Sequence, residues 1–87
     1  MNGWVQTKYG WCRAKTEPGP MGNRYVPRWE RMAAPHVVQD AWNGGWLVLD
    51  GSPDARPFPD RLLPGVTFPT AEAAMVAAEI ELANRAP

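Results

Sequence analysis

Apolar and polar residues alternate in short runs along most of the chain, and a helical pattern is found only near its end. The clearest pattern lies in residues 35–50, where two apolar segments flank the tripeptide Asn-Gly-Gly at positions 43–45. The first segment runs through Trp42 and the second begins at Trp46. Asn-Gly and Gly-Gly supply the positive φ angles that short hairpin turns require. The pattern therefore predicts a β-hairpin over residues 35–50.

The first third of the chain predicts two further strands. Residues 4–13 are rich in strand-forming types and contain no proline, so they predict a strand in which Gly10 forms a bulge or kink. Residues 16–23 carry two prolines and two glycines and predict a loop. Residues 24–32 predict a second strand, which Pro27 confines to the edge of a sheet.

An irregular crossover is expected after the hairpin. Residues 51–69 contain five prolines, too many for regular structure. We expect the segment to be held in place by its large apolar side chains, namely Phe58, Leu62, Leu63 and Phe68.

Residues 71–85 predict a helix, because they contain no glycine or proline and are rich in alanine. Thr70 is a suitable N-cap, and Glu72 places a negative charge in the first turn. Two apolar stripes are candidates for the buried face: Val76, Ile80 and Ala83, or Ala71, Met75, Ala78 and Leu82.

Together these elements predict an α+β fold: an antiparallel sheet of three to four strands with one C-terminal α-helix packed on it. A chain of 87 residues supplies a single domain, residues 1–87. Both a monomer and a dimer are compatible with this pattern.

The composition narrows the class of protein. The chain is 45% hydrophobic and 21% charged, as is usual for a globular protein. No apolar run approaches the ~20 residues that span a bilayer, and the first residues lack the features of a signal peptide. Cys12 is the single cysteine, which excludes an internal disulfide and suits a reducing compartment. We therefore expect a cytoplasmic protein that does not associate with membranes.

The formal net charge is zero, but the charges are unevenly placed. Residues 1–31 carry six basic and two acidic side chains, a net +4, whereas residues 32–87 carry three basic and seven acidic ones, a net −4. Either the molecule has a basic and an acidic end, or the two halves neutralise each other on folding.

The sequence contains little that indicates an enzyme. A nucleophilic pair would have to combine Cys12 with His36, the single histidine, 24 positions away and in no local motif. The carboxylates Asp50, Asp54 and Asp60 match no calcium-loop spacing, and no phosphate-binding glycine loop is present. We therefore expect no catalytic residues, no metal site and no cofactor.

Basic and aromatic residues interleave in the first third of the chain. We predict that partner binding depends on its last part, which combines residue types common at interaction hot spots: Arg24, Tyr25, Arg28, Trp29 and Arg31. On a sheet face, the same interleaving can instead bind nucleic acid by stacking and phosphate contacts. A third interpretation is that the tryptophans form the core and the cations are solvated.

The second half of the chain shows a weak resemblance to known proteins. A Gly-Trp-x-Val strand beginning at Gly45 is followed by Phe68-Pro-Thr and then by an alanine-rich segment that opens with Ala71. This order resembles small bacteriophage and prophage proteins, over less than half of the chain. Such proteins include anti-CRISPR-like inhibitors and small DNA-binding modules. The resemblance implies a non-enzymatic protein in a host cell, which inhibits a host protein complex by stoichiometric binding; the alternative is a nucleic-acid-binding accessory domain.

Overall fold

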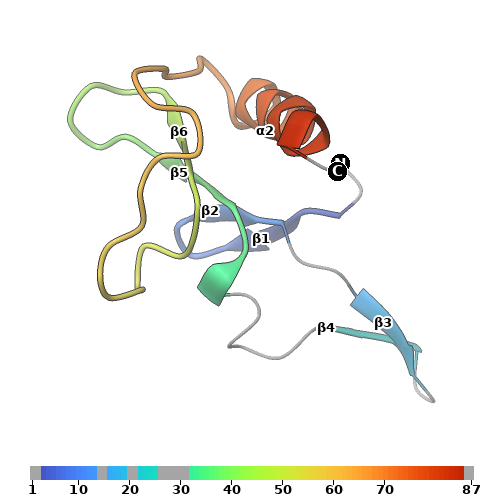
Figure 1. The fold of residues 1–87 in the computed structure, drawn as a ribbon. Coiled ribbons are helices and arrows are strands. Elements are labelled where there is room, and N and C mark those ends of the chain that lie inside the picture. Colours follow the sequence, from blue (N-terminus) through green and yellow to red (C-terminus); the bar gives the residue numbers. More distant parts are fainter. Residues whose placement is uncertain (1–2, 14–15, 20–21, 26–31, 86–87) are drawn as a thin grey trace.

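The computed structural model describes residues 3–13, 16–19, 22–25 and 32–85. Side chains are described for residues 3–13 and 32–85. Its main feature is a four-stranded antiparallel sheet in the order β1-β2-β5-β6, with the helix α2 packed on one face (Figure 1). The strands are β1 (Val5–Thr7), β2 (Gly10–Cys12), β5 (His36–Gln39) and β6 (Trp46–Leu49). The helix α2 spans Ala71–Arg85. The predicted α+β fold is therefore confirmed.

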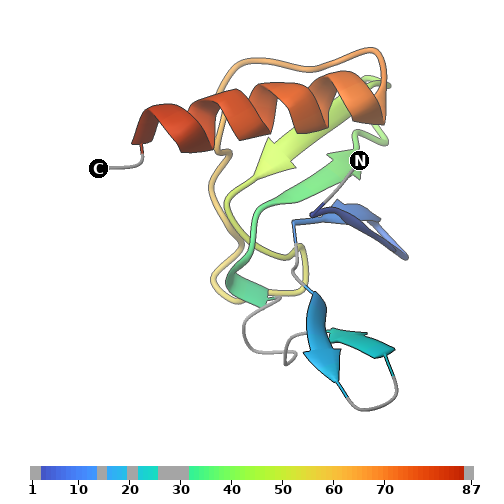
Figure 2. The ribbon, with the colours of Figure 1, turned by 90° about the vertical axis from the view of Figure 1, so that its right-hand side faces the viewer.

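Two short hairpins replace what the sequence predicted as one strand and one loop. Residues 4–13 fold into β1 and β2, which pair from Val5 with Cys12 to Thr7 with Gly10. The second hairpin pairs β3 (Thr16–Gly19) with β4 (Gly22–Tyr25), away from the main sheet (Figure 2). The single-strand prediction was wrong because Lys8 and Tyr9 form a turn that reverses the chain. The loop prediction was wrong because a hairpin accommodates prolines and glycines where the strands are short.

Gly10 is the first residue of β2 and not a bulge within a longer strand. Its φ is 147°, and a Cβ at this position would lie 2.2 Å from the backbone oxygen of Val37. Glycine is therefore required here because β2 approaches β5 closely.

The hairpin predicted over residues 35–50 is confirmed as β5 and β6, and both of its turn glycines have positive φ. The first strand ends at Gln39, however, and not at Trp42 as the sequence predicted. It ends there because the carboxylate of Asp40 accepts the backbone N–H groups of Trp42 and Asn43, which turns the chain away from the ladder.

The segment between β6 and the helix is irregular, as predicted, and it covers the outer edge of β6. Trp46 and Phe68 exchange both backbone hydrogen bonds, and Leu62 donates to Val48. Leu62 is buried and Phe68 is partly buried, but the predicted anchor Phe58 is 59% exposed. That part of the prediction was wrong because Phe58 lies at the rim of a groove and not over the core.

The core lies between α2 and the sheet. One of the two predicted stripes of the helix faces this core: Met75 and Ala78 are buried, and Ala71 and Leu82 are partly buried. Ala74, which neither predicted stripe contained, is buried as well. They contact Val37 and Val48 of the central strands, together with Trp4 and Leu62. Val76 and Ile80, on the other stripe, are exposed. The predicted N-cap is confirmed, because Thr70 Oγ1 accepts the N–H of Ala73 at 3.1 Å. No helix in the described part of the chain is long and apolar enough to cross a membrane.

Candidate functional site

The segment that the sequence predicted as the partner-binding site falls largely outside the described residues. Arg24 and Tyr25 lie in β4, the second strand of the small hairpin. Arg28, Trp29 and Arg31 are outside the described part of the chain. The role of this segment therefore stays a prediction.

Of the other cations in the first third of the chain, the structure describes Lys8 and Arg13, and each is close to a carboxylate. Arg13, just after β2, forms two hydrogen bonds with Glu79 of α2, the shorter at 2.7 Å. Glu79 also accepts the indole N–H of Trp4 at 3.0 Å, and these bonds lower its pKa, with the Arg13 hydrogen bond the largest cause. Lys8, at the other end of the same hairpin, lies 4.0 Å from Asp54. Trp4, Lys8 and Arg13 therefore do not form a shared basic–aromatic face.

Cys12 and His36, distant in the sequence, are directly opposite each other on β2 and β5. Both are almost fully buried, with exposed fractions of 1% and 4%. Burial is the largest influence on His36 and lowers its pKa, which favours the neutral ring. Cys12 packs against Val5 and Ala34. Its lack of a catalytic role stays a prediction.

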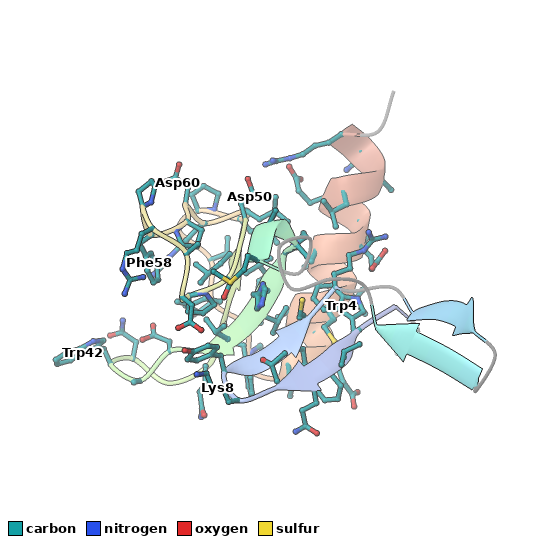
Figure 3. The ribbon with its side chains drawn as sticks, turned by 90° about the horizontal axis from the view of Figure 1, so that it is seen from below. Trp4, Lys8, Trp42, Asp50, Phe58 and Asp60 are labelled. Atoms are coloured by element: carbon teal, nitrogen blue, oxygen red, sulfur yellow. The ribbon has the colours of Figure 1, made fainter. Side chains whose placement is uncertain are left out.

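The most exposed large apolar residue among the described ones is Trp42, whose exposed fraction is 94%. It lies in the loop that joins β5 to β6, and in Figure 3 it extends outward from the end of that loop. Hydrogen bonds of Asp40 hold this loop. Besides the contacts of its carboxylate, its backbone N–H donates to the carbonyl oxygen of Gly45, and its carbonyl oxygen accepts the N–H of Gly44. Asn43 adds a side-chain hydrogen bond to the Asp40 carboxylate at 3.2 Å. These hydrogen bonds hold the backbone of the loop that leaves Trp42 in solvent.

The pKa of Asp40 is lowered, chiefly because its carboxylate accepts hydrogen bonds from the backbone of Trp42 and Asn43. The ionised carboxylate is the form that accepts all these bonds. The ionised carboxylate of Asp40 therefore contributes to the shape of the loop, together with the two backbone hydrogen bonds.

Beside this loop, an apolar groove of about 380 Å³ runs over the sheet face opposite α2. Its floor is formed by alternate residues of β5 and β6, namely Val38, Leu47 and Leu49, whose neighbours Val37 and Val48 face the helix. Its walls are the loop that carries Trp42 and the crossover, which contributes two prolines, Arg61 and Phe58. The groove can therefore accept one or two large apolar side chains between two exposed aromatic rings.

Tyr9 closes one end of this groove. Its hydroxyl donates a hydrogen bond to Asp54 of the crossover, and the ammonium of Lys8 lies 4.9 Å from the centre of its ring. Tyr9 thereby ties the turn of the first hairpin to the crossover, and it lines both the groove and a smaller cavity around Cys12.

Sequence reasoning missed Trp42, because it placed this residue inside a strand, where an aromatic side chain has a structural role. A signal was present: an aspartate two positions before Trp42 and the Asn-Gly-Gly that follows it together indicate a capped loop. No family model, no curated protein and no solved structure matches this chain.

Proposed function

We propose that this protein is a non-enzymatic binding protein that docks on another protein through Trp42 and the groove beside it. The single observation that carries the proposal is the exposure of Trp42 on a loop held in place by Asp40. Burying an aromatic side chain of 150–250 Å² is worth about 4–6 kcal/mol as an upper limit, by the usual area rule. The isolated protein lacks this stabilising free energy because Trp42 is exposed, and a partner that buries Trp42 would provide it.

The groove supports a protein as the partner. Tryptophan is among the residues that contribute most to protein interfaces, typically at the centre of a packed, desolvated patch. The floor of the groove is aliphatic, and its rim carries Phe58 as a second exposed ring. Stacking platforms for nucleic acid combine aromatic rings with a track of cations, whereas Lys8 at the nearby turn lies beside a carboxylate. By the resemblance of the second half of the chain, the proposed partner is a host protein complex, inhibited by occlusion of its surface.

The proposal is tested with Trp42→Ala. A partner captured from a nuclease-treated lysate with the native protein is purified, and its affinity for native and variant proteins is measured by calorimetry. Loss of a hot-spot side chain costs about 2 kcal/mol or more, so the variant should bind at least ~30-fold more weakly. The matched control is Ile80→Ala, which truncates an exposed apolar side chain on the outer face of α2 and should bind with native affinity.

Equal affinity of native protein and Trp42→Ala would refute the proposal. The double variant Arg28→Glu, Arg31→Glu then shows whether the earlier segment is the interface, since it should lower the affinity at least ~10-fold if it is. A complex that is lost after nuclease treatment and weakens log-linearly with salt would identify nucleic acid as the ligand.

A further inference from the structure

A second cavity, of about 260 Å³, lies on the same sheet face near the first hairpin. Its lining residues include Cys12, Met32 and His36, which come from three separate segments. Thiol, thioether and imidazole are the side-chain donors that soft metal ions prefer. The fold therefore places three soft donors around one small cavity, and none of them takes part in the proposed docking surface.

The register of the sheet brings the first two donors close together. Arg13 donates its backbone N–H to Pro35 at 2.9 Å, which makes these two residues a hydrogen-bonded pair. Narrow and wide pairs alternate along an antiparallel ladder, so the neighbouring pair, Cys12 and His36, is the non-hydrogen-bonded kind, in which side chains approach most closely. With metal–sulfur and metal–nitrogen bonds of about 2.3 and 2.0 Å, the two donor atoms lie ~3.5 Å apart at a tetrahedral angle and ~4.3 Å apart at a linear angle. Cβ atoms of such a pair lie about 4.5–5.5 Å apart, so the two side chains can span that distance.

The ring of His36 is oriented as metal-binding imidazoles are. Its Nδ1 lies 2.7 Å from the carbonyl oxygen of Ala34, which requires that Nδ1 carry the proton and donate it. Nε2 then holds a lone pair, and no hydrogen bond reaches it from the residues that the structure describes. The exposed fraction of His36 is 4%, so little of the ring is in contact with solvent.

Met32, the third donor, is held beside the crossover. The backbone oxygen of Met32 accepts the N–H of Ser52 at 2.9 Å, which fixes the position of Met32 beside the crossover. Asp54 and Lys8 also line the cavity, and their opposite charges lie 4.0 Å apart, so the lining as a whole carries no excess negative charge. Within the described ranges, however, no three residues among the histidine, cysteine, aspartate and glutamate types are close enough to hold a metal ion. Hard divalent ions, which prefer several oxygen ligands, are therefore not matched by these residues.

We propose that this cavity is a Cu(I) site in which the sulfur atoms of Cys12 and Met32 and Nε2 of His36 are the ligands. Cu(I) prefers such soft donors and is bound with low coordination numbers. On binding, the ion replaces the proton of the Cys12 thiol, which is released to solvent as H⁺, and no electron is transferred. The site is independent of the docking surface, so neither proposal depends on the other.

The test is a Cu(I) titration of the whole chain under anaerobic conditions, in competition with the coloured chelator bicinchoninate. The native protein should withdraw one Cu(I) per chain from the chelator. Loss of a ligand should weaken binding at least ~100-fold for Cys12→Ser and at least ~10-fold for Met32→Leu. Met75→Leu is the matched control, because Met75 is buried against the opposite face of the sheet and should leave the affinity unchanged. Circular dichroism verifies that each variant is folded.

Failure of the native protein to compete for Cu(I) would overturn the proposal. So would native affinity in folded Cys12→Ser, or equal affinities of Met32→Leu and Met75→Leu, which would show that the thioether of Met32 is not a ligand. If Cys12→Ser does not fold, the comparison of the two methionine variants decides the question without it. Nitrogen NMR of the native protein gives a further readout, since Cu(I) should shift the Nε2 resonance of His36 much more than that of Nδ1.

Discussion

Alanine in place of Gly45 should destabilise the protein more than alanine in place of Gly44, although the two glycines are neighbours with similar backbone angles. Their φ angles are 80° and 72°. A Cβ on Gly45 would lie 2.9 Å from the carbonyl oxygen of Phe68, whereas a Cβ on Gly44 would meet nothing within 4 Å. The same Phe68 oxygen accepts the N–H of Trp46 at 2.8 Å. The substitution at Gly45 therefore strains the loop and also disturbs the contact that holds the crossover on β6.

The magnitudes follow from these two differences. A non-glycine residue in the left-handed region costs about 1–2 kcal/mol, which applies to Gly44→Ala and Gly45→Ala alike. Displacing the Phe68 carbonyl weakens one hydrogen bond, a further loss of about 0.5–1.5 kcal/mol at Gly45 alone. For a domain of this size, each 1 kcal/mol lowers the melting temperature by about 4–8 °C.

The measurement is equilibrium unfolding in guanidinium chloride, followed by tryptophan fluorescence, with the free energy of unfolding taken from linear extrapolation. Gly65→Ala is the control. Gly65 has a φ of 73° and open space around its Cβ position, so Gly65→Ala should lower the unfolding free energy as much as Gly44→Ala does. If Gly45→Ala costs no more than these two, the close approach of Phe68 to the loop does not contribute to stability and the reasoning is refuted.

Three further predictions concern charge and packing. The pKa of Glu79 is lowered from its ordinary value of 4.5, chiefly by its hydrogen bond with Arg13. The ionised Glu79 therefore stabilises the fold above pH 4.5, and this stabilisation is lost as the pH falls through the lowered pKa. The unfolding free energies of the native protein and Glu79→Gln should differ at pH 7 and converge in acid. Met75→Ala should lower the unfolding free energy by about 2–5 kcal/mol because it leaves a cavity under α2. Ile80→Gln should change it by less than about 0.5 kcal/mol, because Ile80 is exposed. Similar losses for both variants would contradict the burial of the Met75 face of the helix. Asp40→Ala should lower the melting temperature and also weaken partner binding, because the loop loses three side-chain hydrogen bonds; unchanged affinity in calorimetry would show that the loop need not be rigid.

Local signals in the sequence were sufficient to predict the hairpin of β5 and β6 and the C-terminal helix, although not the residue at which β5 ends. The hairpin of β5 and β6 follows from alternating apolar residues around Asn-Gly-Gly, and the helix follows from Thr70 and an uninterrupted alanine-rich segment. These elements depend on the intrinsic backbone preferences of single residues, such as the positive φ that glycine adopts at Gly44 and Gly45. The first hairpin was missed because its turn, Lys8 and Tyr9, contains no residue that specifies a turn.

The sites, in contrast, were decided by tertiary structure. The sequence left two apolar stripes on the helix, and only packing against Val37 and Val48 decided that Met75 is buried and Ile80 exposed. Side chains far apart in the chain meet because the register of β2 against β5 sets Cys12 opposite His36. Periodicity and turn chemistry are properties of neighbouring residues, so a single sequence reveals them. Burial, strand register and the closure of a cavity depend on which segments meet, and that is fixed only when the whole chain packs around one core.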